Sequence, residues 1–186
     1  MKKPDKNSLS DRILEYLRDT SKNLFNLSVD IVFNPEEIVG GLIQYRKRKK
    51  YYVSRDVSHL KHSPYFTVKK NEIYLNEKGR IKIIKSIIKD KKKDEKWDGK
   101  WWAIIFDIPE INRRERGFLR KELKWMKFRE LQHSVWITPL SIEKELLALL
   151  KLWRKDFRGD IRFLRIEKII KDDDLKKNFD VTYSRK

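Results

Sequence analysis

The stretch KDKKKDEKWDGK, residues 89–100, constrains the fold most, because it is almost wholly charged and carries a glycine near its end. Such a composition is typical of a linker rather than of a packed element. Hydrophobic residues make up 39% of the 186-residue chain, enough to form a core. We therefore expect two domains, residues 1–88 and 101–170, with a charged linker at 89–100 and a polar tail at 171–186.

The chain is strongly basic, with 46 Lys and Arg against 28 Asp and Glu, a formal charge of +18. The part before Trp97 holds 24 and 13 of these, a net +11, and the rest holds 22 and 15, a net +7. A charge of this size indicates a polyanionic partner, with nucleic acid ahead of a membrane surface. The alternative, a basic surface that serves solubility alone, accounts less well for arginines and aromatics that cluster together.

Composition also excludes several classes. The sequence contains no cysteine, which rules out disulfides, thiol catalysis and cysteine-ligated zinc. The N-terminal residues are basic but form no continuous apolar segment of a secretory signal, and the longest apolar run is too short to span a membrane. We therefore expect a cytoplasmic protein without a membrane partner.

The first half predicts mostly helices followed by a hairpin. The expected elements are a helix at 11–18 that Ser10 can cap, a helix from Pro35 toward Lys50 that Gly40 and Gly41 weaken, a basic helix at 51–62, a hairpin turning at Lys70-Asn71, and a helix over EKGRIKIIKSIIKD. Residues 20–35 stay open between strand and helix. This order is typical of a winged helix-turn-helix domain.

The basic helix carries the candidate DNA contacts. Val53, Val57 and Leu60 form its apolar face, and the rest of its surface carries groups suited to base edges and phosphates. The expected groove contacts are Arg55, Ser58, His59 and His62, and the expected phosphate contacts are Lys49, Lys50, Tyr51, Lys69 and Lys70. His59 and His62 have a spacing compatible with a metal, but no third ligand is evident. The alternative for this half is a small packing domain with a solvated basic face.

The second half alternates strands and helices. We expect a strand at 101–108, a helix at 112–128 with Asn112 as cap and Glu115 in a capping box, a helix from Ser141 and a strand at 161–170. If residues 129–139 supply two strands with a bend near His133-Ser134, the order is that of a ferredoxin-like α/β sandwich. Whether they form one strand or two stays open. The fold class is then α+β, a winged helix-turn-helix followed by a ferredoxin-like domain.

Side chains of this half separate into apolar and basic sets. Phe118, Leu119, Leu123 and Met126 are expected to face inward. The remaining surface of that helix is basic, with Arg113, Arg114, Arg116, Arg120, Lys121, Lys124 and Lys127. We expect packing rather than base stacking for the tryptophans, which are Trp101, Trp102, Trp125, Trp136 and Trp153.

The stretch FDIPEINRRERGFLRKELKWMKFRELQHSVWITPL resembles the central domain of the PaaX-like repressors of phenylacetate catabolism. It also resembles the small CRISPR-associated endoribonuclease that forms the dimeric core of the spacer-integration complex. The shared features are an apolar strand ending at Asp107, the Arg113-Arg114 helix start, and the Gln132-x-Ser134-Val135 segment. The resemblance covers about residues 97–170.

A winged helix in front of this module is the PaaX-like arrangement. The resemblance therefore implies a homodimeric, sequence-specific regulator that binds double-stranded DNA, with repression as its expected action. The longer repressors carry a further C-terminal domain, whereas only KDDDLKKNFDVTYSRK follows the last expected strand here. The acyl-CoA response of those repressors is therefore not expected to carry over, and the small-molecule effector stays unknown. No cofactor is expected, except magnesium if the chain is a nuclease.

The resemblance to the CRISPR protein implies a second function, a magnesium-dependent nuclease or a non-catalytic integration subunit. In that family the matching aspartate faces its twin across a two-fold axis, so Asp107 becomes the metal and catalytic candidate. Two carboxylates can suffice because magnesium keeps several waters. Glu110 could assist through a water, and His133 could act as a base, although its place in the alternating pattern points it into the sheet or core.

The alternative to catalysis is a structural role for Asp107, as a turn residue before Pro109 or as the partner of an arginine of the next helix. No cluster of acidic residues surrounds it in the sequence, which favours this interpretation over catalysis. A third class, a non-catalytic RNA-binding or scaffold protein, also accounts for the charge of +18. It would show no preference among duplex sequences.

Overall fold

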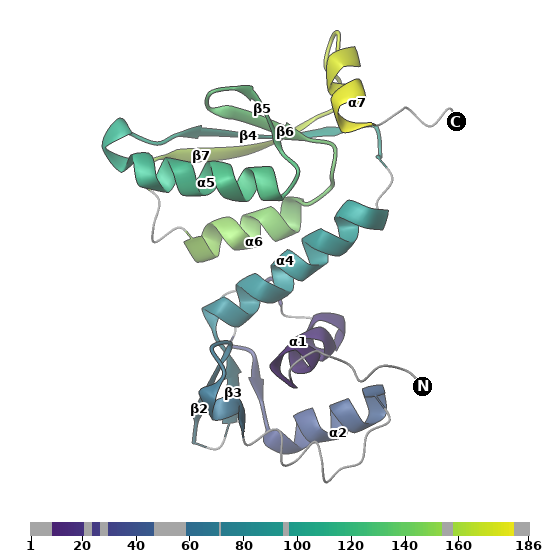
Figure 1. Ribbon diagram of the computed structural model, residues 1–186, viewed down its shortest axis with the longest axis vertical. Helices are drawn as coiled ribbons and strands as arrows, with labels where there is room; N and C mark the ends of the chain where they lie inside the picture. The colour runs from purple at the N-terminus through teal and green to yellow at the C-terminus, as the bar shows by residue number, and fades with distance from the viewer. Residues whose placement is uncertain are drawn as a thin grey trace. The chain divides into compact units, whose positions relative to one another are not determined.

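The computed structural model describes residues 9–20, 24–26, 30–46, 59–70, 72–94, 97–153 and 158–180 (Figure 1). The chain divides into two compact units, residues 1–87 and 88–186, and the boundary falls within helix α4 (Glu77–Asp94). Both units combine helices with an antiparallel sheet, so the fold is mixed α+β. Each unit is described by itself.

The first unit is built around a three-stranded sheet with the order β1-β3-β2. Its elements are α1 (Leu9–Thr20), β1 (Val32–Phe33), α2 (Pro35–Arg46), the 3-10 helix η1 (His59–His62), β2 (Phe66–Lys69), β3 (Glu72–Leu75) and the start of α4. The expected hairpin is confirmed, since Val68 pairs with Ile73 and Lys69 with Glu72. The segment left open at 20–35 supplies β1, which pairs with β3.

Helix α1 packs one apolar stripe into the core of the first unit. Ile13, Leu14 and Leu17 are buried, as their spacing predicts, and they join a cluster with Ile38 and Ile73. The helix begins at Leu9, so Ser10 lies within it and is not the cap that the sequence suggested. The Ser10 hydroxyl instead donates to Ser63 Oγ over 3.0 Å.

The sequence predicts that Gly40 and Gly41 weaken α2, but the helix continues through both glycines to Arg46. A Cβ built on Gly41 would overlap the ring and hydroxyl of Tyr16, whereas one built on Gly40 would meet nothing within 4 Å. Gly41 is therefore the position at which α1 approaches α2 closely. Its helix propensity is low, but the missing side chain is what lets Tyr16 pack.

We expect Gly40→Ala to raise the free energy of unfolding by about 0.4–1 kcal/mol, because alanine restricts the unfolded chain and meets open space. Gly41→Ala should lower it by about 1–3 kcal/mol, because the new Cβ has to displace the Tyr16 ring. Urea unfolding followed by circular dichroism measures both. A stabilised Gly41→Ala variant would contradict the close packing of α1 on α2.

The second unit contains a four-stranded sheet with the order β5-β6-β4-β7, antiparallel throughout. After α4 come β4 (Trp101–Asp107), the 3-10 helix η2 (Glu110–Asn112), α5 (Arg113–Trp125), β5 (Arg129–Gln132), β6 (Val135–Thr138), α6 (Glu143–Trp153), β7 (Asp160–Ile166) and α7 (Asp173–Phe179). Residues 129–139 thus form two strands that turn at His133-Ser134. The resulting β-α-β-β-α-β order is that of a ferredoxin-like unit.

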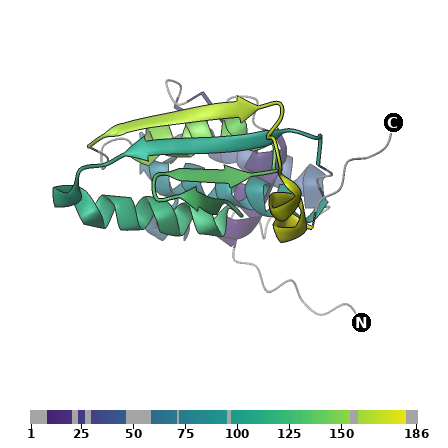
Figure 2. The same ribbon diagram turned by 90° about the horizontal axis from the view of Figure 1, so that it is seen from above.

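The two faces of this sheet differ. Helices α5 and α6 cover one face (Figure 1). Alternate residues of β4 point to that face, namely the buried Trp102, Ile104 and Phe106. Trp136 lies on the same face, because it pairs directly with Ile104. Figure 2 looks onto the opposite face, where α7 lies over one end of the strands. That end holds Trp101, which is fully buried. None of the described helices lies over the remainder of this face.

Helix α7 is fixed by a polar contact as well as by packing. The Trp101 indole N–H donates to Asp172 Oδ2 over 3.1 Å, and Lys176 Nζ lies 2.5 Å from the same carboxylate. Leu175 and Phe179 pack with Trp101 and Ile137. Residues 171–186 were expected to be a polar tail. Residues 173–179 instead form a helix, because Leu175 and Phe179 are four residues apart and both pack on the sheet.

Four further expectations differ from the structure. Helix α4 continues to Asp94, so the first part of the expected linker is helical, and Lys91 Nζ donates to Ser141 O over 2.6 Å. Asn112 occupies the N-cap position of α5 without a side-chain cap. Glu115 accepts a hydrogen bond from the Arg158 amide over 2.9 Å, which takes the place of a capping box. Phe118 is 40% exposed, although it lies 5.4 Å edge-on to Trp153.

The Asp172 contact predicts a pH dependence of stability. Burial alone would raise the pKa of Asp172, but the hydrogen bonds from Lys176 and Trp101 hold that pKa below its usual value. A carboxyl with a lowered folded pKa contributes stability above its unfolded pKa and loses that contribution as pH falls through the folded pKa. The contribution should therefore be present at pH 7 and lost below about pH 4.

We expect Asp172→Asn to lower the free energy of unfolding at pH 7 by about 1–3 kcal/mol, because it weakens charge-assisted bonds to a buried carboxylate. The deficit relative to the wild type should shrink on acidification below about pH 4. Thermal unfolding between pH 7 and pH 3 measures it. Asp173→Asn is the control, since the Asp173 side chain is 96% exposed. A deficit that stays constant with pH would contradict the role given to Asp172.

Candidate nucleic-acid interface

The tip of the β2–β3 hairpin presents two adjacent lysines. Lys69 ends β2, Lys70 follows it in the turn, and both side chains are exposed. Lys70 has a φ of 46°, in the left-handed region that suits a tight hairpin turn. Exposed cations at the end of a strand are suited to phosphate contacts.

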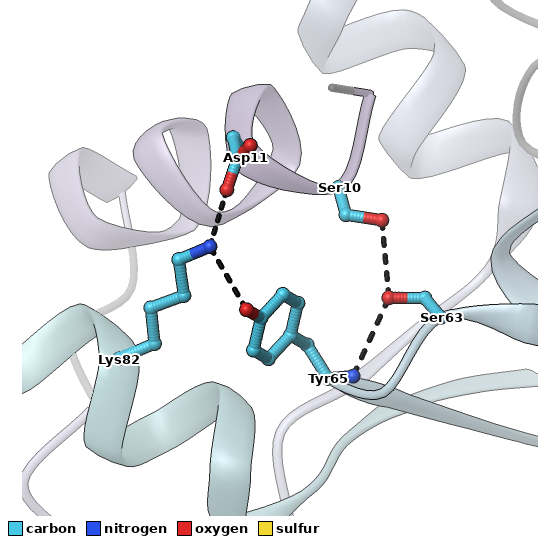
Figure 3. Close-up of polar contacts among 5 residues, drawn as sticks. All are labelled: Ser10, Asp11, Ser63, Tyr65 and Lys82. Carbon is cyan, nitrogen blue, oxygen red and sulfur yellow. Dashed lines mark hydrogen bonds and ion pairs between the residues drawn. The ribbon is translucent and has the colours of Figure 1, made fainter. Parts of the chain in front are cut away.

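Polar contacts hold the start of this hairpin against α1 and α4 (Figure 3). Ser63 Oγ accepts hydrogen bonds from Ser10 Oγ over 3.0 Å and from the Tyr65 amide over 3.3 Å. Lys82 Nζ donates to the Tyr65 hydroxyl over 3.1 Å and pairs with Asp11. Lys82 and Asp11 are both about a third exposed or more, so this pair fixes geometry more than it adds stability.

Asn76 joins the two strands of the hairpin to α4. Its side-chain amide donates to Pro64 O over 3.0 Å, and its Oδ1 accepts from the Gly79 amide over 3.0 Å in the first turn of α4. Asn76 was not among the residues predicted from the sequence. An asparagine just before a helix is a capping signal, and that signal could have identified it.

The structure covers the sequence-predicted contacts of the first unit only in part. Lys49, Lys50, Tyr51, Arg55 and Ser58 lie outside the described residues. Of His59 only the backbone is described, as the first residue of η1, while His62 ends η1 with its side chain exposed. Between them Leu60 is 1% exposed, which agrees with its expected place on an apolar face.

Asp107 ends β4 with its side chain exposed, on the sheet face opposite α5 and α6. Its register partner is Asp160 on β7, whose carboxylate accepts a hydrogen bond from Arg162 Nε over 2.6 Å. A Cβ on Gly159 would collide with the backbone carbonyl of Asp107, so the chain passes very close to the end of β4 here. Across the described part of the chain, no three His, Cys, Asp or Glu side chains group as a metal site.

The two residues considered as helpers of Asp107 have other partners. Glu110 pairs with Arg116. His133 lies 3.2 Å from Glu130, with its side chain 93% exposed. The expectation that His133 points into the sheet or core is wrong, because the bend at His133-Ser134 interrupts the strand alternation on which it rested.

An apolar area remains uncovered near Asp107. Ile105 and Leu164 are each 39% exposed, and the register places both on the face opposite α5 and α6 together with half-buried Val135. We call these three residues the open sheet face. Exposed aliphatic side chains on neighbouring strands mark a candidate interaction surface.

The second unit is thus an antiparallel α+β domain with one face covered by two helices and one face half open. Residues 94–176 match the family model described as PaaX protein central Cas2-like domain. Residues 94–176 therefore form a PaaX-like central domain, and the resemblance predicted from the sequence is confirmed for this part of the chain. No curated protein and no solved structure matches the chain.

The helices within the described ranges are too short or too polar for any of them to cross a membrane.

We expect RNA and duplex DNA to stay intact when incubated with the protein, with or without magnesium, because Asp107 has only the arginine-compensated Asp160 as a register neighbour. Denaturing gels of labelled RNA and duplex measure this. Asp107→Asn should match the wild type, with Asp173→Asn as an exposed-acid control. Magnesium-dependent cleavage that Asp107→Asn alone removes would make the protein a nuclease.

Proposed function

We propose that the protein is a sequence-specific, DNA-binding transcriptional regulator of the PaaX-like type that acts as a homodimer, with repression as its expected action. The observation that carries this proposal is that one chain combines a PaaX-like central domain with a basic unit in front of it. A PaaX-like central domain at 94–176 follows a basic unit whose hairpin exposes Lys69 and Lys70 at its tip.

The element order of the first unit supports a winged helix-turn-helix. A helix, a short strand and a second helix precede a β-hairpin. Hydrogen bonds join the residues that flank the hairpin, Tyr65 and Asn76, to the start of α4. In this proposal the hairpin is the wing, and Lys69 and Lys70 contact the DNA backbone. The proposed groove contacts are Arg55, Ser58, His59 and His62, of which Arg55 and Ser58 belong to the stretch outside the described residues.

A second copy of the chain is the proposed occupant of the open sheet face. A regulator that reads an inverted repeat needs two DNA-binding units related by a two-fold axis, and an isologous interface uses the same surface on each copy. Ile105, Val135 and Leu164 form an aliphatic strip on neighbouring strands, and Arg162 and Asp160 beside them carry opposite charges. Such a patch is suited to self-pairing.

The double variant Lys69→Gln/Lys70→Asn tests the wing. Asparagine tolerates the left-handed conformation of residue 70, so charge is removed without straining the turn. We expect weaker binding to all duplexes alike and a salt dependence reduced by roughly 1–2 units of slope in log K against log salt. Fluorescence anisotropy over a salt series measures both effects.

The matched control is Lys168→Gln/Lys171→Asn. Both lysines are exposed, and Lys171 also has a left-handed φ, of 59°, so the chemical changes are the same. The control should bind like the wild type. Equal binding by both double variants would show that the hairpin does not contact the DNA. Selection of duplexes from a random pool completes the test, because an RNA-binding or scaffold protein would enrich no inverted repeat.

A further inference from the structure

The outer side of α5 carries a dense set of cations that the proposed function does not use. Arg113, Arg114, Lys121 and Lys124 are all exposed, and with 3.6 residues per turn they fall within about one third of the helix circumference. We call these four residues the α5 basic face. Gly117 lies at its centre, and a Cβ there would meet nothing within 4 Å.

The carboxylates of α5 do not neutralise this face. Glu122 is buried on the opposite side of the helix. Glu115 is turned toward the backbone and accepts a hydrogen bond from the Arg158 amide over 2.9 Å. The other two arginines of the helix serve the fold, since Arg116 pairs with Glu110 and Arg120 donates to His133 O over 2.7 Å. The four exposed cations are therefore a separate set, in which Lys124 Nζ also lies 5.8 Å from the centroid of the Trp136 ring.

The positive surface continues past the end of α5 onto the end of α4. Lys127 Nζ donates to the backbone carbonyl of Lys92 over 3.2 Å, which places these two lysines side by side. Burial lowers the pKa of Lys92, and the charges of Lys127 and Lys89 lower that pKa further. These like charges repel one another in the free protein, so an anion at this place would relieve the repulsion.

The same end of α5 borders a surface hollow of about 400 Å³. Lys124, Lys127 and Arg129 line it, together with Asn178 and the carboxylate of Asp180. Three cations against one carboxylate make the hollow suitable for an anionic group. The lysine pair and the hollow lengthen the basic surface beyond the helix itself.

We infer that the α5 basic face is a second contact surface for the phosphate backbone of duplex DNA, separate from the hairpin of the first unit. Arg114 and Lys124 are ten residues apart on a straight helix, about 15 Å along its axis. Phosphates of one strand repeat about every 3.4 Å along the duplex axis, so the face spans roughly four of them. Arginine and lysine on a rigid helix are the donors that phosphates prefer. That the polyanion is duplex DNA rests on the proposed function.

Gly117 allows this surface to be tested without removing any cation. Gly117→Glu places a carboxylate among the four charges, and Gly117→Gln is its uncharged match. Both fill open space and replace glycine in a helix, so both should fold and unfold at a higher temperature than the wild type. We expect Gly117→Glu to bind duplex about three- to tenfold more weakly than Gly117→Gln at low salt, with a difference that shrinks as salt rises.

A charge-removal variant gives the second readout. Lys121→Gln/Lys124→Gln should lower the slope of log K against log salt by roughly 1–2 units, while Lys168→Gln/Lys171→Asn leaves it unchanged. The full chain is used throughout, with the selected duplex and a scrambled duplex of equal length. Because phosphate contacts carry no sequence information, the ratio of affinities for the two duplexes should stay constant.

The outcomes separate the two proposals. If the wild type prefers the selected duplex and Gly117→Glu binds it as tightly as Gly117→Gln, the second surface is refuted and the proposed function stands. If the wild type shows no preference among duplexes, the proposed function fails, whatever the Gly117 variants do. If Gly117→Glu loses binding to vesicles of anionic lipid but not to duplex, the surface recognises membranes and the inference is overturned.

Discussion

The second unit depends on β4, which is paired along both edges and is therefore the strand around which the sheet is built. Its two ends have different surroundings. At the beginning, Trp101 is buried on the face away from α5 and α6, because α7 covers it and Asp172 accepts its indole N–H. Toward the other end, Ile105 is 39% exposed and Asp107 is in solvent. Along this one strand, the sheet face thus changes from a half that α7 covers to a half that no described helix covers.

Local patterns predicted the elements whose signals lie within a few residues. The apolar run at 101–106, the stripe of α1 and the hairpin at 66–75 are all found, because periodicity and turn chemistry are written in consecutive positions. Helix α7 was missed because its apolar content is two residues, Leu175 and Phe179, whose burial depends on Trp101 more than 70 residues earlier. His133 was misplaced for a related reason, since the turn at His133-Ser134 takes it out of both strands and so out of the strand alternation.

Basic residues were the hardest to assign from sequence, because a charge count does not separate structural cations from exposed ones. Arg80 is 5% exposed and donates to Asn26 O, and Lys91 donates to Ser141 O while pairing with buried Glu145. Lys82 holds Tyr65 through contacts with distant residues that no spacing rule reveals. Exposed cations also lie on other elements, for example Lys78 and Lys89 on α4 and Lys144 and Lys151 on α6, so the hairpin tip and α5 hold only some of them.

Which side chains remain exposed matters, because the fold alone does not distinguish a regulator from a nuclease. The family model that matches residues 94–176 describes its central domain as Cas2-like, so the architecture is compatible with either chemistry and particular side chains have to distinguish them. A nuclease needs carboxylates gathered at one point, whereas Asp107 has Asp160 as its register neighbour and Arg162 engages that residue. A DNA-binding protein needs cations spread over ordered surfaces at distances comparable to phosphate spacing. The exposed cations of the two units have that distribution, with Lys69 and Lys70 in one unit and the α5 basic face in the other. The proposed function therefore rests on where charge remains exposed after folding, and this is why substitutions at Lys69, Lys70 and Gly117 test it more directly than changes in the sheet.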